Sequence, residues 1–86
     1  MAYRIEFSVV FEKQLRKLKR KDKILFERLR KKIDEIVRNP KHYKPLRNIL
    51  KGTRRAHLDP FAIIFMIKGD EVVFLYVKHH DNAYAK

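Results

Sequence analysis

Four side chains in the second half of the chain are of types that suit chemistry at a phosphodiester bond: Arg55, His57, His80 and Tyr84. Histidine has a reference pKa of about 6.5, so it can act as an acid or a base near neutral pH. Arginine can bind a phosphate through two N–H groups and stabilise negative charge as it develops. Tyrosine can orient a hydroxyl group or stack on an unpaired base. This set predicts RNA cleavage through attack by the neighbouring 2′-hydroxyl, a reaction that requires no metal ion or other cofactor.

Arg55 and His57 lie in a stretch that reads as a β-strand. Alternate residues of a strand project to the same face of a sheet, so these two side chains point one way and Arg54 points the other. If the helices cover the face of Arg54, then Arg55 and His57 lie on the open face. His80 and Tyr84 follow the last predicted strand and could bend onto that face. We therefore expect the four candidates to surround one positively charged patch.

The elements that must hold these side chains are three predicted strands, spanning residues 53–58, 61–67 and 71–78. The middle run is apolar on both of its alternating faces, as expected for a strand that is covered on both sides or flanked by neighbours. Gly69 and Asp70 form a two-residue hairpin signal between the last two strands, because glycine readily adopts the positive φ that such turns require. The three strands are predicted to form an antiparallel meander.

The first half of the chain predicts a short strand, residues 3–7, and then two helices. Ser8 and Asp22 are suitable N-caps, since their side-chain oxygens can accept from a free N–H of the first helical turn. Pro40 ends the second helix, because proline cannot extend the helical hydrogen bonds. The second helix carries one apolar stripe, formed by Leu25, Phe26, Leu29, Ile33, Ile36 and Val37.

The short link between the helices predicts an antiparallel helical hairpin, and the sheet is the only cover available for its apolar face. Residues 41–52 have no steady period, so we expect a loop anchored by Leu46, Ile49 and Leu50. The predicted fold class is α+β: a short N-terminal strand, the helical hairpin, then the three-stranded antiparallel meander. No second boundary or repeat interrupts this order, so residues 1–86 are predicted to form a single domain.

Composition excludes several classes of protein. The chain has 86 residues and no cysteine, so neither a disulfide framework nor a thiolate metal site is available. A hydrophobic content of 45% is sufficient for a folded core. No apolar run approaches the roughly 20 residues of a membrane span, and the start of the chain is too charged for a signal peptide. We therefore expect a cytoplasmic protein that does not contact membranes.

The charge of the chain points to its partners. Lysine and arginine outnumber aspartate and glutamate by 22 to 10, for a net charge of +12. The positive electrostatic potential of so basic a chain predicts a polyanionic partner, which could be a nucleic acid, an acidic protein, or both in turn. The basic helix faces are equally compatible with a solvated surface. The side chains predicted to contact RNA beside the catalytic candidates are Arg47, Lys51, Arg54 and Lys78.

Other interpretations of these residues compete with catalysis. His57 could be an ordinary histidine at a strand edge, and Tyr84 could simply pack the C-terminus. The run from His79 to Asp81 is reminiscent of a metal cluster, but adjacent strand residues diverge and no spaced set of carboxylates supports them, so no metal site is predicted. From the residues alone, a nuclease and a simple RNA-binding module both remain open.

Taken together, these segments resemble the RelE/ParE superfamily of toxins, and specifically its RelE-type mRNA interferases. Residues 45–57, PLRNILKGTRRAH, are similar to the PLKGxLKGxxRxxR segment that leads into the sheet of that family. The ending HHDNAY, residues 79–84, is similar to the family's HRDxxY or HHDxxY tail. The resemblance covers essentially the whole chain and rests on the order and spacing of these segments.

The resemblance implies a RelE-like fold and a metal-independent ribonuclease that cleaves mRNA on the ribosome. It also implies neutralisation by an acidic, RelB-like antitoxin. By position, Arg55 and His57 match the family's basic pair on the first strand of the meander. His80 matches the arginine or histidine after the last strand, and Tyr84 matches the terminal tyrosine.

One departure from the family pattern affects the predicted site. Many relatives carry an arginine just after an aromatic residue at the start of the middle strand, where this chain has Phe61 and Ala62. Alanine cannot stabilise a charged phosphorane, so Arg55 or Arg54 would have to do so. The departure also keeps two alternatives open: a ParE-like toxin that poisons gyrase, and a basic binding module without catalysis.

Overall fold

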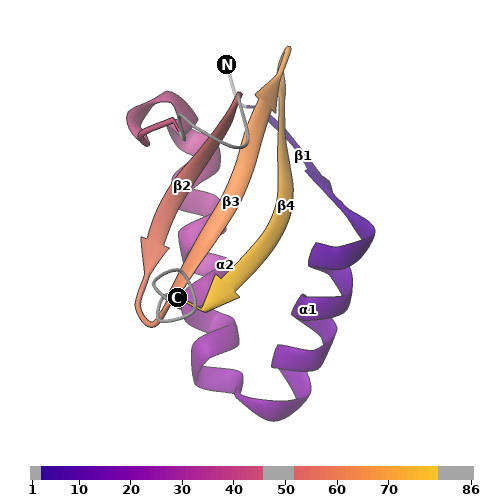
Figure 1. The fold of residues 1–86 in the computed structure, drawn as a ribbon. Coiled ribbons are helices and arrows are strands. Elements are labelled where there is room, and N and C mark those ends of the chain that lie inside the picture. Colours follow the sequence, from indigo (N-terminus) through magenta and orange to yellow (C-terminus); the bar gives the residue numbers. More distant parts are fainter. Residues whose placement is uncertain (1–2, 46–51, 80–86) are drawn as a thin grey trace, which may run out of the picture.

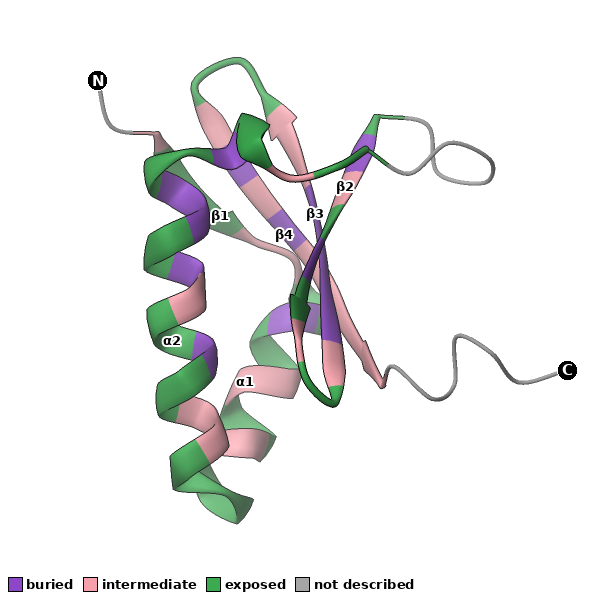
Figure 2. Cartoon of the chain, turned by 90° about the vertical axis from the view of Figure 1, so that its left-hand side faces the viewer, coloured by how far each residue is buried: buried purple, intermediate pink, exposed green. Residues whose placement is uncertain are grey.

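Two helices cover one face of a four-stranded sheet, as Figures 1 and 2 show. The computed structural model describes residues 3–45 and 52–79. In chain order, the elements are β1 (Arg4–Phe7), α1 (Val9–Lys21), α2 (Lys23–Arg38), the 3-10 helix η1 (Pro40–His42), β2 (Thr53–Leu58), β3 (Phe61–Lys68) and β4 (Glu71–His79). We call the sheet face turned away from α1 and α2 the outer face; no helix or strand of the described ranges lies over it. The α+β class predicted from the sequence is confirmed.

The boundaries of the helices follow from their capping residues. The Ser8 side chain accepts a hydrogen bond from the Phe11 amide at 3.0 Å, which starts α1. Asp22 is the single residue between the helices, and its carboxylate accepts from the Leu25 amide at 3.1 Å. Asn39 is the C-cap of α2, directly before Pro40. The helical hairpin and both predicted N-caps are confirmed.

The sheet has the strand order β1-β4-β3-β2. β2, β3 and β4 form the predicted antiparallel meander, and Gly69 has a φ of 61° in the turn between β3 and β4. β1 pairs with β4 in parallel, so the sheet is mixed rather than fully antiparallel. Parallel neighbours require a long crossover, and the helical hairpin provides part of it.

The core lies between the helices and the inner face of the sheet. Leu29, Ile33, Ile36 and Val37 of the predicted α2 stripe are buried, while Leu25 and Phe26 are half-buried near the start of the helix. From the sheet, the buried members of the cluster are Ala56, Ile63, Phe65, Val72 and Phe74. Phe11 joins the layers, with its ring centroid 5.4 Å from that of Phe74. Through this apolar layer, β3 and β4 pack against the helices.

The segment after α2 returns to the edge of the sheet, as the sequence predicted. The Tyr43 ring packs edge-on against Phe65 with centroids 5.8 Å apart, and the Arg55 amide donates to the Lys44 carbonyl at 3.2 Å. The proposed anchors Leu46, Ile49 and Leu50 lie outside the described residues. Neither described α-helix has the length and apolar character needed to cross a membrane.

Candidate functional site

Two rows of side chains cross the outer face of the sheet. In the first row, Ala62 on β3 is paired with His57 on β2 and with Lys78 on β4. In the second, Ile64 is paired with Arg55 and with Tyr76. Directly paired residues have Cβ atoms about 4.5–5.5 Å apart, so each row forms one continuous strip of side chains.

The orientation of these rows follows from the core. Ala56 and Ile63 are paired with each other and are both buried among the helix side chains. Residues next to them along the strands must project to the opposite face. Arg55 and His57 therefore point away from the helices, and both are exposed. The prediction that these two side chains share the face away from the helices is confirmed.

The centre of the outer face is apolar and its margins are polar. Ala62 and Ile64 are each only 1% exposed although they lie on the face away from the helices. Arg55 and His57 stand on one side of them, and Tyr76 and Lys78 stand half-buried on the other. Such an arrangement can hold an anion between cationic groups, with imidazole and phenol groups within the same surface.

Lys78 and Tyr76 reach the outer face only because β4 contains a bulge. Ile64 is paired with Tyr76, but the next residue of β3, Phe65, is paired with Phe74, so Leu75 is an extra residue. In a regular strand with no bulge, Tyr76 and Lys78 would lie on the same face as Phe74 and point into the core. A bulge bends its strand and changes the direction of the side chains beyond it, and bulges are frequent next to active sites.

Side chains of the β1–α1 segment stabilise β4 on both sides of this bulge. The Ser8 hydroxyl donates to the carbonyl of Leu75 at 2.5 Å, and the Ser8 amide donates to that of Phe74 at 2.9 Å. Beyond the end of β1, the Gln14 amide group both donates to the Val77 carbonyl and accepts from the Val77 N–H, each at 2.8 Å. The Gln14 side chain thus makes the two hydrogen bonds to the Val77 backbone that a neighbouring strand would otherwise make. Tyr76 could not be placed from the sequence, because the β4 sequence shows no clear alternation. The contacts of Ser8 and Gln14 with β4 could not be predicted either, because they join residues that are 67 and 63 positions apart.

Arg54 does not join Arg55 and His57. Arg54 is next to Arg55 in β2, so its side chain projects to the opposite face of the sheet. Its guanidinium donates a hydrogen bond to the Tyr43 carbonyl at 2.7 Å. The suggestion that Arg54 could replace the missing arginine at position 62 is therefore wrong, because its side chain is directed to the other face and bonded there. Its predicted contact with RNA stays a prediction.

Most of the remaining predicted residues are not among the described ones. Arg47, Lys51, His80 and Tyr84 lie outside the described residues, and their roles stay predictions. His79 is described: its ring lies edge-on to Phe61 with centroids 5.2 Å apart, at the strand position that alternates with Lys78. Its side chain is therefore directed to the helix-facing side of the sheet, away from the two rows.

The helices add a strongly basic surface. A hollow on α1 is lined entirely by basic residues, and in the described part of the chain none of them forms an ion pair: Lys13, Arg16, Lys17, Lys19 and Arg20. On α2 the charges are partly balanced, because Arg30 pairs with Glu27 at 3.2 Å and Lys32 pairs with Glu35 at 2.9 Å. The Lys32 ammonium lowers the pKa of Glu35. The positive charge on α1, which no described carboxylate balances, would attract a polyanionic partner.

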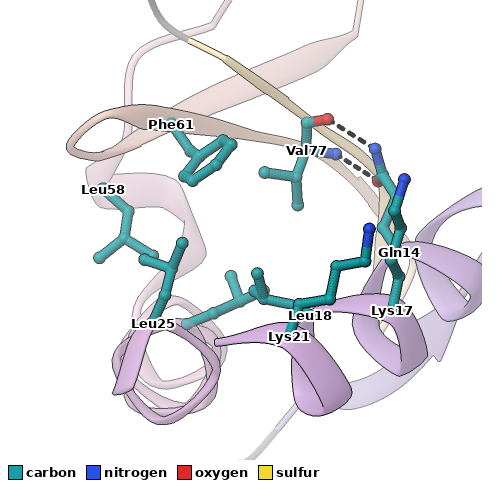
Figure 3. Close-up of a pocket in the computed structure, with 9 residues that line it drawn as sticks. Gln14, Lys17, Leu18, Lys21, Leu25, Leu58, Phe61 and Val77 are labelled. Atoms are coloured by element: carbon teal, nitrogen blue, oxygen red, sulfur yellow. Dashed lines mark hydrogen bonds between the residues drawn. The ribbon is translucent and has the colours of Figure 1, made fainter. Parts of the chain in front are cut away.

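An apolar groove opens on the opposite side of the sheet from the two rows (Figure 3). It has a volume of about 320 Å³ and lies between the helical hairpin and the ends of β2, β3 and β4. Its apolar lining comprises Leu18, Leu25, Leu29, Leu58, Phe61 and Val77, and its other lining residues are Gln14, Lys17 and Lys21. The groove has no titratable acid–base pair in its lining, so it suits the binding of apolar side chains better than catalysis.

The chain matches known proteins along nearly its whole length. Residues 5–84 match the family model of the ParE toxin of the type II toxin-antitoxin system parDE. A protein of Methanocaldococcus jannaschii that carries the provisional name toxin RelE4 is 39% identical over 98% of this chain and 93% of its own length.

Solved structures show the same fold. The toxin-antitoxin complex RelBE2 of Mycobacterium tuberculosis contains a chain that is 28% identical, with a TM-score of 0.74, over 92% of this chain and 99% of that one. A chain of the intact RelBE toxin-antitoxin complex of Escherichia coli has a TM-score of 0.74 at 23% identity, over 91% of this chain and 96% of that one. The chain therefore belongs to the RelE/ParE superfamily, the toxins of type II toxin-antitoxin systems.

Proposed function

We propose that this toxin is a ribosome-dependent mRNA endoribonuclease of the RelE type. The observation that carries the proposal is the placement of Arg55, His57, Tyr76 and Lys78 around Ala62 and Ile64 on one face of the sheet. Cleavage of an RNA phosphodiester needs a base, an acid and positive charge beside the phosphate, and the imidazole and the cations on this surface can supply them, while the phenol can orient the substrate. Sites built on strands also hold their geometry better than sites on loops.

The proposed reaction is attack of the 2′-oxygen on the adjacent phosphorus, with release of the 5′-oxygen. A base takes the 2′-hydroxyl proton, an acid gives a proton to the leaving 5′-oxygen, and the products carry a 2′,3′-cyclic phosphate and a 5′-hydroxyl. We assign one of the two proton transfers to His80 and the other to His57. Arg55 stabilises the phosphorane, and Tyr84 positions the nucleotide beside it.

The test compares two adjacent histidines. Loss of a general acid or base lowers a rate by about 10²- to 10⁴-fold, so His80→Ala should lose most cleavage of ribosome-bound mRNA in single-turnover assays. Its affinity for ribosomes should change little. His79→Ala is the matched control, because the His79 ring packs on Phe61 away from the rows, and it should lose much less.

Equal losses in the two histidine variants would contradict the assignment of His80. Absence of any cleavage by the wild type in the presence of ribosomes would overturn the nuclease proposal itself. Tyr84→Phe, measured in the same series, reports whether the phenol hydroxyl contributes.

We also propose that an acidic, RelB-like antitoxin is the protein partner. The proposal is supported by the net charge of +12 and by similar solved structures that are toxin-antitoxin complexes. The antitoxin should cover the surface of Arg55, His57 and Tyr84 or deform the segments that carry it. Purification from the native operon should yield the two proteins together. Recovery of the chain alone, with normal cell growth on overexpression, would contradict this proposal.

A second function is favoured by two observations. Position 62 is alanine, not the arginine of many RelE-type relatives, and the matching family model is that of ParE toxins. A ParE-like protein would inhibit gyrase without nuclease chemistry. Supercoiling by purified gyrase in the presence of this chain distinguishes the two: inhibition there, with intact mRNA on ribosomes, would replace the first proposal with the second.

A further inference from the structure

We propose that Lys78 provides the positive charge that stabilises the scissile phosphate over Ala62. This inference rests on the proposed nuclease function and deepens it. The sequence placed Lys78 only among general RNA contacts and left phosphate stabilisation to Arg55 or Arg54. The structure adds to Arg55 a second cation for this role, the lysine on the neighbouring strand.

Lys78 lies directly beside Ala62 in the sheet. Lys78 is the direct pairing partner of Ala62 on β4, and His57 is its direct partner on β2. Neighbouring strands are about 4.7–4.9 Å apart, so the backbones of His57 and Lys78 are separated by two strand spacings. Only the small alanine side chain lies between them. The lysine has a four-carbon stem that can carry its ammonium over the alanine methyl.

The bulge in β4 turns Lys78 outward. Val72 and Phe74 point into the core, and Lys78 would share their face if β4 were regular. The extra residue Leu75 reverses the alternation, and the Ser8 hydroxyl donates to its carbonyl. A buried lysine would be costly, whereas the bulge leaves Lys78 half-buried on the outer face.

The other described cations of the sheet lie elsewhere or are already bonded. Arg54 is bonded to the Tyr43 carbonyl on the other side. Arg4 lies at the far end of the sheet, bonded to Asp70 at 3.1 Å, and Lys68 lies at that same end, directly across from Glu71 in the strand register. Arg55 is in the next row, across from Ile64. Within residues 3–45 and 52–79, Lys78 forms no ion pair, so its charge is not neutralised by a described carboxylate.

The chemical role follows from these positions. Attack by the 2′-oxygen places extra negative charge on the non-bridging oxygens of the phosphorane. An ammonium held beside that group stabilises the transition state more than the ground state, because the charge is greater there. Arg55, one row away, can hold the same or the adjacent phosphate through two N–H groups. Lys78 thus acts in place of a cation on β3.

The experiment uses variants of Lys78 in single-turnover cleavage of ribosome-bound mRNA. Lys78→Met retains the apolar stem but removes the charge, and loss of one such stabilising group should lower the rate by about 10²- to 10³-fold. Ribosome affinity, measured separately, should fall far less. Lys78→Arg should retain much of the activity. Lys68→Met, a lysine on the same face but at the far end of the sheet, is the control and should cleave normally.

A further variant tests whether a positive charge at this place in the sheet is sufficient, whichever residue carries it. Introducing Ala62→Arg into the Lys78→Met protein returns a cation to the same spot from β3 and should restore cleavage. If Lys78→Met cleaves within threefold of the wild type, or loses only as much as Lys68→Met, the inference is wrong while the nuclease proposal stands. If the wild type does not cleave at all, the nuclease proposal falls, and this inference falls with it.

Discussion

The two faces of β3 carry similar side chains but lie in different surroundings. Ile63 and Phe65 on the inner face and Ala62 and Ile64 on the outer face are all almost completely buried. The inner pair is surrounded by apolar side chains of the helices and neighbouring strands. On the outer face, the neighbours of Ile64 and Ala62 across the strands are Arg55, His57, Tyr76 and Lys78.

The difference shows how one strand can serve both stability and function. The inner face contributes burial of apolar surface, which is the main favourable term in folding. The outer face adds an apolar centre that keeps its charged margins at fixed positions. Substitutions on the inner face should therefore lower stability, and substitutions at the outer margin should lower function at nearly constant stability.

The largest expected effect on stability comes from the inner side. Leu29→Ala removes a side chain that is 2% exposed, and it should lower the free energy of unfolding by about 2–5 kcal/mol. Arg55→Ala is the matched outer-face control and should stay within about 0.5 kcal/mol of the wild type. Chemical denaturation measures both. Equal stability of Leu29→Ala and the wild type would mean that the faces have been assigned the wrong way round.

A smaller effect tests the link between the faces. Ser8→Ala removes the N-cap of α1 and the bond to Leu75, so it should cost about 1–2 kcal/mol and also reduce RNA cleavage, since Tyr76 and Lys78 lie just beyond the bulge. Asp22→Ala removes only the cap of α2 and should cost about 1 kcal/mol without affecting cleavage. If both variants cleave equally well, the bulge does not position the site.

The smallest effect concerns charge at the outer margin. If Arg55 contacts a phosphate, Arg55→Gln should flatten the slope of log affinity against log salt by about 0.7–0.9 for RNA or ribosomes. Arg30→Gln is the control, because Arg30 on α2 is already paired with Glu27 at 3.2 Å. An affinity that does not change with salt in the wild type would contradict the electrostatic argument altogether.

Much of the fold could be predicted because its determinants are local. Ser8, Asp22 and Pro40 mark helix boundaries through their own hydrogen-bonding capacity, and Gly69 marks the hairpin through its φ. The period of the α2 stripe identified the buried helix face. Residues 53–58 were predicted with their observed bounds, and the other two strands of the meander each extend one residue further than predicted.

Half of the candidate site was also accessible from the sequence. Arg55 and His57 lie on a regular strand, where simple alternation with the buried Ala56 decides the face. Tyr76 and the orientation of Lys78 were not accessible. A single extra residue in β4 reverses every side chain beyond it, and nothing in the run of apolar residues from Val72 to Val77 locates that residue.

The sequence by itself determined the elements, their ends, the helical hairpin and the shared face of Arg55 and His57, since these depend on residues a few positions apart. Only the tertiary structure decided the parallel pairing of β1 with β4, the bond of Arg54 to the Tyr43 carbonyl, and the bulge at Leu75. Ser8 and Leu75 are 67 residues apart and meet only when β1 docks beside β4. Contacts over such separations leave no periodic trace in either segment, so the side of the sheet on which Lys78 lies could be known only from the folded chain.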